Sequence, residues 1–515
     1  MEKTTQMLKK VFGYDSFRPG QEPVADALVA GRDVLAVMPT GAGKSICYQI
    51  PALLLPGITV VVSPLVSLMQ DQVRALVSVD VKAAYLNSSL NDRQKALMLQ
   101  RACDGWYKII YVAPERLEMP GFLRFCACQP ISLVVVDEAH CISQWGQDFR
   151  PSYLKIADFI RRLPFRPAVG AFTATATDRV KQDILTTLHL EDPLVQTASF
   201  DRPNLHFAVE HDLPSEKPEA LVKLLRQEKG NSGIVYCNTV KQVEETTDFL
   251  QGRGFSAAAY HARLQAEQRR QTQEDFLFDR VQIIVATNAF GMGIDKPNVR
   301  FVIHYNMPSD LESYYQEAGR AGRDGDPARC TLLYSGSDVR TIRWFIEQER
   351  DNDNGTDIKQ RAEAAIKAEE RLKWMTFYST TQGCLRNFIL RYFGERPVAD
   401  CEHCGNCEEK AQLRVYHQKL AERPRPTAGQ RATEQVEQET DEKLCGALFQ
   451  LRKRLASRKK VPAFLIYTDA VAREIARHKP LTMDQLAGIP GFPEARAKAY
   501  GRDIINLVQQ FTGNE

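Results

Sequence analysis

The segment Met38-Pro-Thr-Gly-Ala-Gly-Lys-Ser45 decides the fold of the first part of this chain. It joins an apolar run, Val34 to Val37, to a stretch with helical character, which predicts a glycine-rich turn between a strand and a helix. The backbone N–H groups of such a turn can wrap a phosphate chain. The strict pattern has a glycine where this chain has Met38, so a second signal is needed. The candidate phosphate-binding residues are Thr40, Gly41, Gly43, Lys44 and Ser45.

A second segment, Leu133-Val-Val-Val-Asp-Glu-Ala-His140, supplies two carboxylates. It is typical of a buried parallel strand, and its carboxyl end is where ligands bind in open α/β sheets. We expect Lys44 to reach the β- and γ-phosphates of a nucleoside triphosphate, and Ser45 and Asp137 to hold Mg²⁺. Glu138 is expected to orient the attacking water. The two segments together predict nucleotide hydrolysis.

From about residue 20 to 340, short β-branched runs alternate with helical patterns, which predicts an α/β fold. The runs are numerous enough for two parallel sheets, each covered by helices on both faces. Residues 197–217, with prolines at 203 and 214, are the expected joint. The predicted strands are 34–37, 59–63, 109–112, 133–136, 168–172, 233–236, 257–260, 281–286 and 301–304.

After residue 340 the strand signals stop, and helical patterns predominate. Residues 422–439 are rich in Pro, Gln, Glu and Thr and predict a linker. A last compact unit begins near 441, where Leu444, Leu448, Leu451 and Leu455 have helical spacing. The expected domains are 1–205, 206–340, a module at 341–412, a linker at 413–440 and a helical domain at 441–515.

Composition is that of a globular protein, with 25% charged and 44% hydrophobic residues. No apolar stretch approaches a membrane span, and the first residues lack the apolar core of a secretory signal. We therefore expect an intracellular protein, cytoplasmic and nucleoid-associated if bacterial. The net charge is +3, but residues 441–515 hold thirteen Lys/Arg against eight Asp/Glu. This basic tail is a candidate phosphate-binding surface, although a merely solvated basic face has the same composition.

Four of the twelve cysteines form a metal-binding pattern. Cys401-Glu-His-Cys-Gly-Asn-Cys407 places thiols two residues apart, and Cys384 adds a fourth. This spacing suits a tetrahedral Zn²⁺ site, with an iron–sulfur cluster as the alternative. His403 is expected to face solvent.

Several motifs resemble those of the RecQ family of superfamily 2 DNA helicases. They are the two segments above and Phe12-Gly-Tyr-Asp-Ser-Phe-Arg-Pro-Gly-Gln21, Thr173-Ala-Thr-Ala176, Ala286-Thr-Asn-Ala-Phe-Gly-Met-Gly-Ile-Asp295 and Tyr315-Gln-Glu-Ala-Gly-Arg-Ala-Gly-Arg-Asp-Gly325. The resemblance covers residues 1–410 and the chain from about 441.

The resemblance implies two RecA-like motor domains, a helical zinc-binding module and a small all-α HRDC domain. It also implies an ATP-dependent DNA helicase that moves 3′ to 5′ on single strands and acts in repair or recombination. Its expected cofactors are ATP, Mg²⁺ and Zn²⁺. Single-stranded and branched DNA are the expected partners, with single-strand-binding or recombination proteins as further candidates.

The resemblance also assigns a nucleotide-specificity element and an arginine finger. The side-chain amide of Gln21 matches the edge of adenine, and Tyr14 or Arg18 can stack on the base or contact phosphate. Arg320 and Arg323 lie three residues apart, so they can face one phosphate, and the position of Arg323 is the finger in similar proteins. Gln316 belongs to the same candidate catalytic motif. The alternatives are aromatics that pack a helix start and arginines in surface ion pairs.

The segment Cys141-Ile-Ser-Gln-Trp-Gly-Gln-Asp-Phe-Arg150 resembles the loop that couples DNA binding to ATP turnover in this family. Trp145 and Phe149 offer stacking faces for unpaired bases, and Arg150 offers a phosphate contact. The usual histidine is replaced by Gln147. The alternative is that Trp145 is a core aromatic.

The chain departs from fuller members of the family in one region. Only about thirty residues separate Cys407 from the last folded unit, which is too short for a winged-helix domain. A DNA-stimulated ATPase that remodels junctions with little strand separation is therefore an alternative. An RNA helicase with the same motor is another. The tail domain, with its basic stretch Arg452 to Lys460, is expected to act as a DNA tether on a flexible linker.

Overall fold

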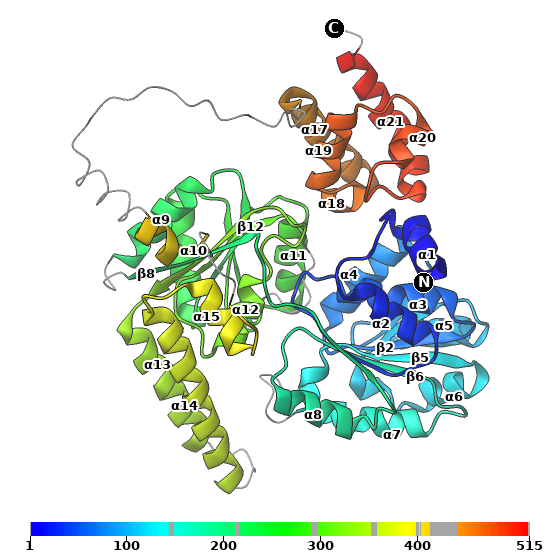
Figure 1. The fold of residues 1–515 in the computed structure, drawn as a ribbon, viewed down its shortest axis with the longest axis horizontal. Helices are drawn as coiled ribbons and strands as arrows, with labels where there is room; N and C mark the ends of the chain where they lie inside the picture. Colours follow the sequence, from blue (N-terminus) through cyan, green and yellow to red (C-terminus); the bar gives the residue numbers. More distant parts are fainter. Residues whose placement is uncertain are drawn as a thin grey trace.

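The computed structural model describes residues 2–143, 149–211, 216–290, 296–351, 358–397, 401, 403–411 and 441–512. Trp145, Gln147 and the predicted linker at 413–440 lie outside these ranges. Figure 1 shows two α/β domains side by side, a long helical hairpin that projects from the second domain, and a separate helical bundle at the C-terminus. Within the described residues, no helix has both the length and the apolar character needed to cross a bilayer.

The first domain contains a seven-stranded sheet in the order β3-β4-β2-β5-β6-β1-β7, and every pairing is parallel. Val- and Ile-rich strands such as β5 are buried because helices cover both faces. The strands are β1 Val34–Val37, β2 Ile58–Val62, β3 Ala83–Leu86, β4 Ile109–Val112, β5 Ile131–Val136, β6 Ala168–Thr173 and β7 Leu194–Thr197. The helices are α1 Glu2–Phe12, α2 Gln21–Val29, α3 Lys44–Leu54, α4 Val66–Val77, α5 Asp92–Cys103, α6 Pro120–Cys128, α7 Lys155–Arg161 and α8 Asp178–Thr187.

The second domain contains a six-stranded parallel sheet in the order β10-β11-β9-β12-β13-β8. Its strands are β8 Leu205–His211, β9 Ser232–Tyr236, β10 Ala257–Tyr260, β11 Ile283–Ala286, β12 Val299–His304 and β13 Ala328–Tyr334. Its helices are α9 Lys217–Gln227, α10 Val240–Gly252, α11 Ala266–Leu277 and α12 Leu311–Ala318. The prediction of two parallel sheets is confirmed.

The predicted joint at 197–217 is wrong in part. Residues 205–211 form β8, which pairs along its whole length with β13, so the connection between the sheets is confined to residues 198–204. The prolines at 203 and 214 flank this strand instead of breaking it. The sequence patterns also missed β3, β7 and β13.

The helical module consists of α13 Gly336–Asp351, α14 Ile358–Thr380 and α15 Leu385–Tyr392. The C-terminal bundle consists of α17 Glu442–Lys459, α18 Ala463–Ile466, α19 Asp469–His478, α20 Met483–Ala487 and α21 Glu494–Thr512. The four leucines at helical spacing lie on α17 and are buried in the core of this bundle, as predicted. Figure 1 shows α18 on the side of the bundle that faces the two sheets.

Candidate functional site

The glycine-rich turn leaves β1 at its carboxyl end and enters α3 at Lys44. Gly41 and Gly43 have φ angles of 85° and 81°, a region that strongly favours glycine, and Gly43 is the N-cap of the helix. A Cβ on Gly41 would lie 3.0 Å from Nη1 of Arg202. The turn is therefore shaped by backbone conformation and by a close neighbour from the connection between the two sheets.

Asp137 and Glu138 follow β5, two strands away from β1 in the sheet, and line the same cleft as Lys44. Burial, assisted by the negative charge of Glu138, raises the pKa of Asp137 to about 7, although Lys44 opposes this shift. Burial also lowers the pKa of Lys44, whose Nζ donates a hydrogen bond to the carbonyl of Met38 at 3.1 Å. The three charged groups are thus close enough to influence one another.

A chain of polar contacts runs from Glu138 to the second domain. Glu138 has a φ of 50°, an uncommon conformation for a residue with a side chain. Its carboxylate lies 3.4 Å from Nδ1 of His140, which lies 2.9 Å from the hydroxyl of Thr173. That hydroxyl donates to the carbonyl of Thr175 at 3.0 Å, and the amide of Gln316 donates to the Thr175 hydroxyl at 3.5 Å. The motif that contains Thr173 therefore connects the carboxylates of the first domain with α12 of the second.

Arg320 and Arg323 come from the turn after α12 and line the cleft opposite the glycine-rich turn. Cγ of Arg323 lies 3.3 Å from the position of a Cβ on Gly41, and its charge is one of the influences that lower the pKa of Lys44. The cleft has a volume of about 440 Å³. The first domain thus contributes anionic and cationic groups to this cavity, and the second domain contributes cationic groups.

Arg202 contacts the glycine-rich turn, and the sequence patterns did not reveal it. Its guanidinium donates to the carbonyl of Thr40 on one side, and to the carbonyls of Ala321 and Gly322 on the other at 3.1 and 3.0 Å. Burial lowers its pKa, and the nearby charges of Arg323 and Arg18 act in the same direction. Arg202 belongs to no motif, so only the tertiary structure identifies it as a bridge between the two domains.

The predicted adenine-recognition element lies beside the glycine-rich turn. The amide nitrogen of Gln21 donates to the carbonyls of Ala42 and Gly43 at 2.8 and 3.1 Å, and its oxygen accepts from the backbone N–H of Arg18. The Arg18 guanidinium donates to the carbonyl of Gly41 at 2.7 Å. Tyr14 is 43% exposed and lines the cleft. In this arrangement Gln21 and Arg18 support the turn through its carbonyl groups.

The four cysteines of the metal-binding pattern meet next to β8. The sulfur atoms of Cys384, Cys401, Cys404 and Cys407 lie within 4.8 Å of one another, and those of Cys384 and Cys404 are 3.9 Å apart. A hydrogen bond from Cys384 lowers the pKa of Cys404 to about 4, against the effect of burial. These distances fit four thiolates around one ion with metal–sulfur bonds of about 2.3 Å. His403 is outside the sulfur cluster and packs edge to face on His206.

Phe149 and Arg150, from the predicted DNA-coupling loop, are half-buried, and Arg150 donates to the carbonyl of Pro64 at 3.3 Å. In the C-terminal bundle, Arg452 is buried and pairs with Asp469 at 2.7 Å and with the carbonyl of Tyr467 at 2.9 Å. The expectation that Arg452 contacts DNA phosphate is therefore wrong, because its charge stabilises the fold of the bundle. The exposed basic residues of α17 and its C-terminus are Lys443, Lys453, Arg454, Arg458, Lys459 and Lys460.

Four family models match successive parts of the chain. A DEAD/DEAH box helicase model matches residues 18–184, and a helicase conserved C-terminal domain matches 216–325. A RecQ zinc-binding model matches 336–408, and an HRDC domain matches 441–508. Both sheets therefore belong to the helicase motor, and ATP with Mg²⁺ is the nucleotide system that such domains use.

Curated relatives match almost the whole chain. The ATP-dependent DNA helicase RecQ of Pasteurella multocida is 34% identical over 98% of this chain and 93% of its own length. The protein of the same name from Bacillus subtilis is 34% identical over 99% of both chains. The Pasteurella alignment runs over 602 positions, more than the 515 residues of this chain, so that relative contains segments with no counterpart here.

A solved structure supports the architecture. The Mycobacterium smegmatis helicase Lhr bound to ssDNA and AMP-PNP superposes with a TM-score of 0.55 at 19% identity, and the match covers 73% of this chain and 57% of that one. At this identity the likeness concerns the fold alone. The sequence relatives and the ordered family models carry the assignment, and the chain belongs to the RecQ family of ATP-dependent DNA helicases.

Proposed function

We propose that this helicase moves 3′ to 5′ on single-stranded DNA and unwinds duplex or branched DNA during repair and recombination. The observation that carries the proposal is the composition of the cleft. Lys44, Asp137 and Glu138 from the first domain share it with Arg320 and Arg323 from the second. A nucleotide bound there contacts both domains, so its hydrolysis changes their relative position.

Each cleft residue has a distinct task in this proposal. The backbone of Thr40–Gly43 and the ammonium of Lys44 bind the phosphates, and Ser45 and Asp137 would hold Mg²⁺, which neutralises charge on the phosphates. Glu138 orients the attacking water. Arg323 stabilises the charge that develops on the γ-phosphate, an effect that can reach 10³-fold or more in rate.

Base recognition and coupling to DNA involve residues on either side of the phosphates. Tyr14, Arg18 and Gln21 form the side of the cleft assigned to adenine, supported by their place beside the glycine-rich turn. Trp145, Phe149 and Arg150 contact single-stranded DNA. Because Glu138 is only a few residues earlier in the chain, DNA binding to this loop is coupled to ATP hydrolysis at Glu138. Gln316, through the Thr175 contact, aligns the second domain with this loop.

We propose Zn²⁺ as the metal of the cysteine cluster. Four thiols and no other ligand type favour zinc over Mg²⁺ or Ca²⁺, and the match to a RecQ zinc-binding model supports the same choice over an iron–sulfur cluster. Bound there, zinc would link α15 to the loop at 401–407 and would stabilise a region with little core of its own. Its task is structural.

A second candidate function is a DNA-stimulated ATPase that binds and remodels junctions with little strand separation. It is favoured by the Pasteurella alignment, in which segments of that helicase have no counterpart here. The short interval between Cys407 and the HRDC domain leaves no room for a winged-helix domain.

One set of assays separates these functions. ATP hydrolysis and strand separation are measured on matched DNA and RNA substrates with 3′ or 5′ single-stranded tails. The proposal expects DNA-stimulated hydrolysis and unwinding only with 3′ tails. Stimulation without unwinding would select the remodelling function, and preference for RNA would select an RNA helicase.

A further inference from the structure

The HRDC domain packs against the adenine-side loop of the ATP cleft. The backbone N–H of Gly491 donates to the carbonyl of Gly13 at 2.9 Å, immediately before Tyr14. A Cβ on Gly491 would lie 3.4 Å from the ring of Tyr14, so the two segments are in van der Waals contact. Gly13 has a φ of 77°, and a Cβ there would lie 2.7 Å from the backbone of Pro493. No side chain fits between these loops.

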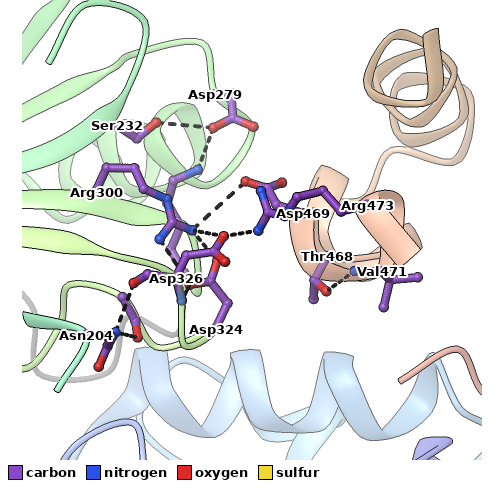
Figure 2. A network of polar contacts seen from close by, with 12 residues as sticks. Asn204, Ser232, Asp279, Arg300, Asp324, Asp326, Thr468, Asp469, Val471 and Arg473 are labelled. Carbon is purple, nitrogen blue, oxygen red and sulfur yellow. Dashed lines mark hydrogen bonds and ion pairs between the residues drawn. The ribbon is translucent and has the colours of Figure 1, made fainter. Parts of the chain in front are cut away.

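The same domain also contacts the loop that follows the arginine finger. Arg473 of α19 forms an ion pair with Asp326, three residues after Arg323 (Figure 2). Arg300 of β12 connects the second motor domain to the HRDC domain. Its guanidinium contacts Asp324, Asp326 at 3.5 Å and, in the HRDC domain, Asp469 at 4.0 Å. The three carboxylates of this cluster thus face arginine side chains. This charge balance accounts for their proximity without a metal ion.

Side chains of the HRDC domain form part of the cleft wall. Pro462, Phe464, Leu465 and Thr468 line it, and Phe464 also packs against the hydrophobic core of the motor. Arg496 lines the cleft as well, and its buried Nε has no hydrogen-bond partner among the described residues. Burial lowers the pKa of this guanidinium, while the nearby Tyr14 and Tyr500 oppose the shift. A buried cation of this kind favours an anion in the adjoining cavity.

We propose that the HRDC domain is a positioning element of the ATP site, which holds the Tyr14 loop through its Gly491 turn and the Arg323 loop through Arg473. The inference rests on the proposed function of the cleft. It adds to the expectation that this domain is a DNA tether, because a tether alone needs no contact with either half of the nucleotide site. Undocking of the domain should weaken ATP binding, since only the docked fraction presents a complete cleft.

Charge reversal of Arg473 tests the proposal in the full-length protein. We expect Arg473→Glu to raise the KM for ATP about fivefold, because the docked fraction falls when an attraction becomes a repulsion. Arg473→Lys keeps the charge and should stay within about twofold of wild type. Arg477→Glu is the matched control, since Arg477 lies one turn further along α19 and pairs within its own helix with Glu474 at 2.8 Å. KM is measured at saturating single-stranded DNA, so that DNA affinity does not enter the comparison.

A glycine pair gives a second, independent test. Gly13→Ala should displace the HRDC backbone and raise the KM for ATP, whereas Gly31→Ala introduces the same backbone strain without a clash. Gly31 has a φ of 79°, and a Cβ there would meet nothing within 4 Å. Because both substitutions weaken one docking equilibrium and KM varies inversely with the docked fraction, Gly13→Ala combined with Arg473→Glu should raise KM by at least the product of the single effects.

Hydrogen exchange of residues 489–493 measures docking directly, and we expect it to quicken in Arg473→Glu and Gly13→Ala but not in the controls. An unchanged KM in a variant that undocks would overturn the proposal. Unchanged exchange in both variants would overturn it as well, because these contacts would then not hold the domain. Lys44→Ala tests the cleft assignment separately: wild-type turnover in that variant would refute the proposed function, whatever the KM of Arg473→Glu.

Discussion

Replacement of Arg202 by alanine should slow ATP hydrolysis about 10- to 100-fold. Arg202 links the glycine-rich turn to the arginine-finger loop in series, through the carbonyl of Thr40 on one side and those of Ala321 and Gly322 on the other. The energy with which Arg202 couples the two segments is limited by the side with fewer hydrogen bonds. That side is the single charge-assisted hydrogen bond to the carbonyl of Thr40. Such a bond contributes about 1.5–3 kcal/mol, and each 1.4 kcal/mol corresponds to about tenfold in rate.

The assay is steady-state ATP hydrolysis at saturating ATP and single-stranded DNA, with a thermal unfolding curve for each variant. Arg202→Lys should recover only part of the rate, because one ammonium cannot replace a planar guanidinium that bonds to Thr40 and to Ala321 and Gly322 at the same time. Arg32→Ala is the control, since the side chain of Arg32 is 46% exposed. Among the described residues it contacts only Asp192, the carboxylate at 3.5 Å and the carbonyl at 2.8 Å. A turnover number for Arg202→Ala within twofold of wild type, at an unchanged melting temperature, would refute the role of this bridge.

Further predictions concern the other parts of the site. Arg323→Ala should leave ATP binding nearly normal and reduce turnover by about 10³ or more, as rapid-mixing kinetics can test; equal losses in both would indicate a ground-state contact. Cys404→Ser should release zinc and lower the melting temperature, measured by metal analysis, and an iron chromophore in the wild type would contradict the zinc assignment. Trp145→Ala should keep basal ATPase but lose DNA stimulation, and unchanged stimulation would place Trp145 in the core. The raised pKa of Asp137, about 7, keeps this group protonated below neutrality. Mg²⁺ affinity should therefore fall about tenfold per pH unit below 7, and calorimetry that finds no such slope would contradict this.

Local sequence patterns predicted the strands whose own residues match the burial of the strand. β1 was predicted at its observed bounds because four consecutive apolar residues are buried on both faces of a parallel sheet. β3, with the sequence Ala-Ala-Tyr-Leu, lacks β-branched residues and gave no such signal. β7 at the sheet edge has an exposed Val195, so it does not resemble a buried strand. These segments become strands because the adjacent strands β4 and β1 have free backbone groups with which they form hydrogen bonds. That pairing depends on residues far away in the sequence.

In the candidate site, too, residues in local motifs were predicted and residues defined by tertiary contacts were not. Lys44, Asp137 and Arg323 were predicted because phosphate chemistry requires fixed residue types within short motifs. Arg202 and the Gly13–Gly491 contact were not predicted, because each depends on two surfaces that meet only in the folded chain. The basic stretch of the tail domain was read as one surface, yet Arg452 is buried with Asp469, since a charge pattern does not distinguish a solvated face from an internal ion pair.

The contact between the cysteine loop and β8 has a consequence for the life of the protein in the cell. β8 is an edge strand, and Cys404 pairs with Phe207 on its open side, while Gly405 lies close enough that a Cβ would be 3.3 Å from Ala208. Edge strands that lose their cover pair readily with other chains. If the bound metal is the proposed zinc, its depletion should therefore convert folded protein into aggregates before the motor itself unfolds, and zinc supply would then set how much helicase the cell retains.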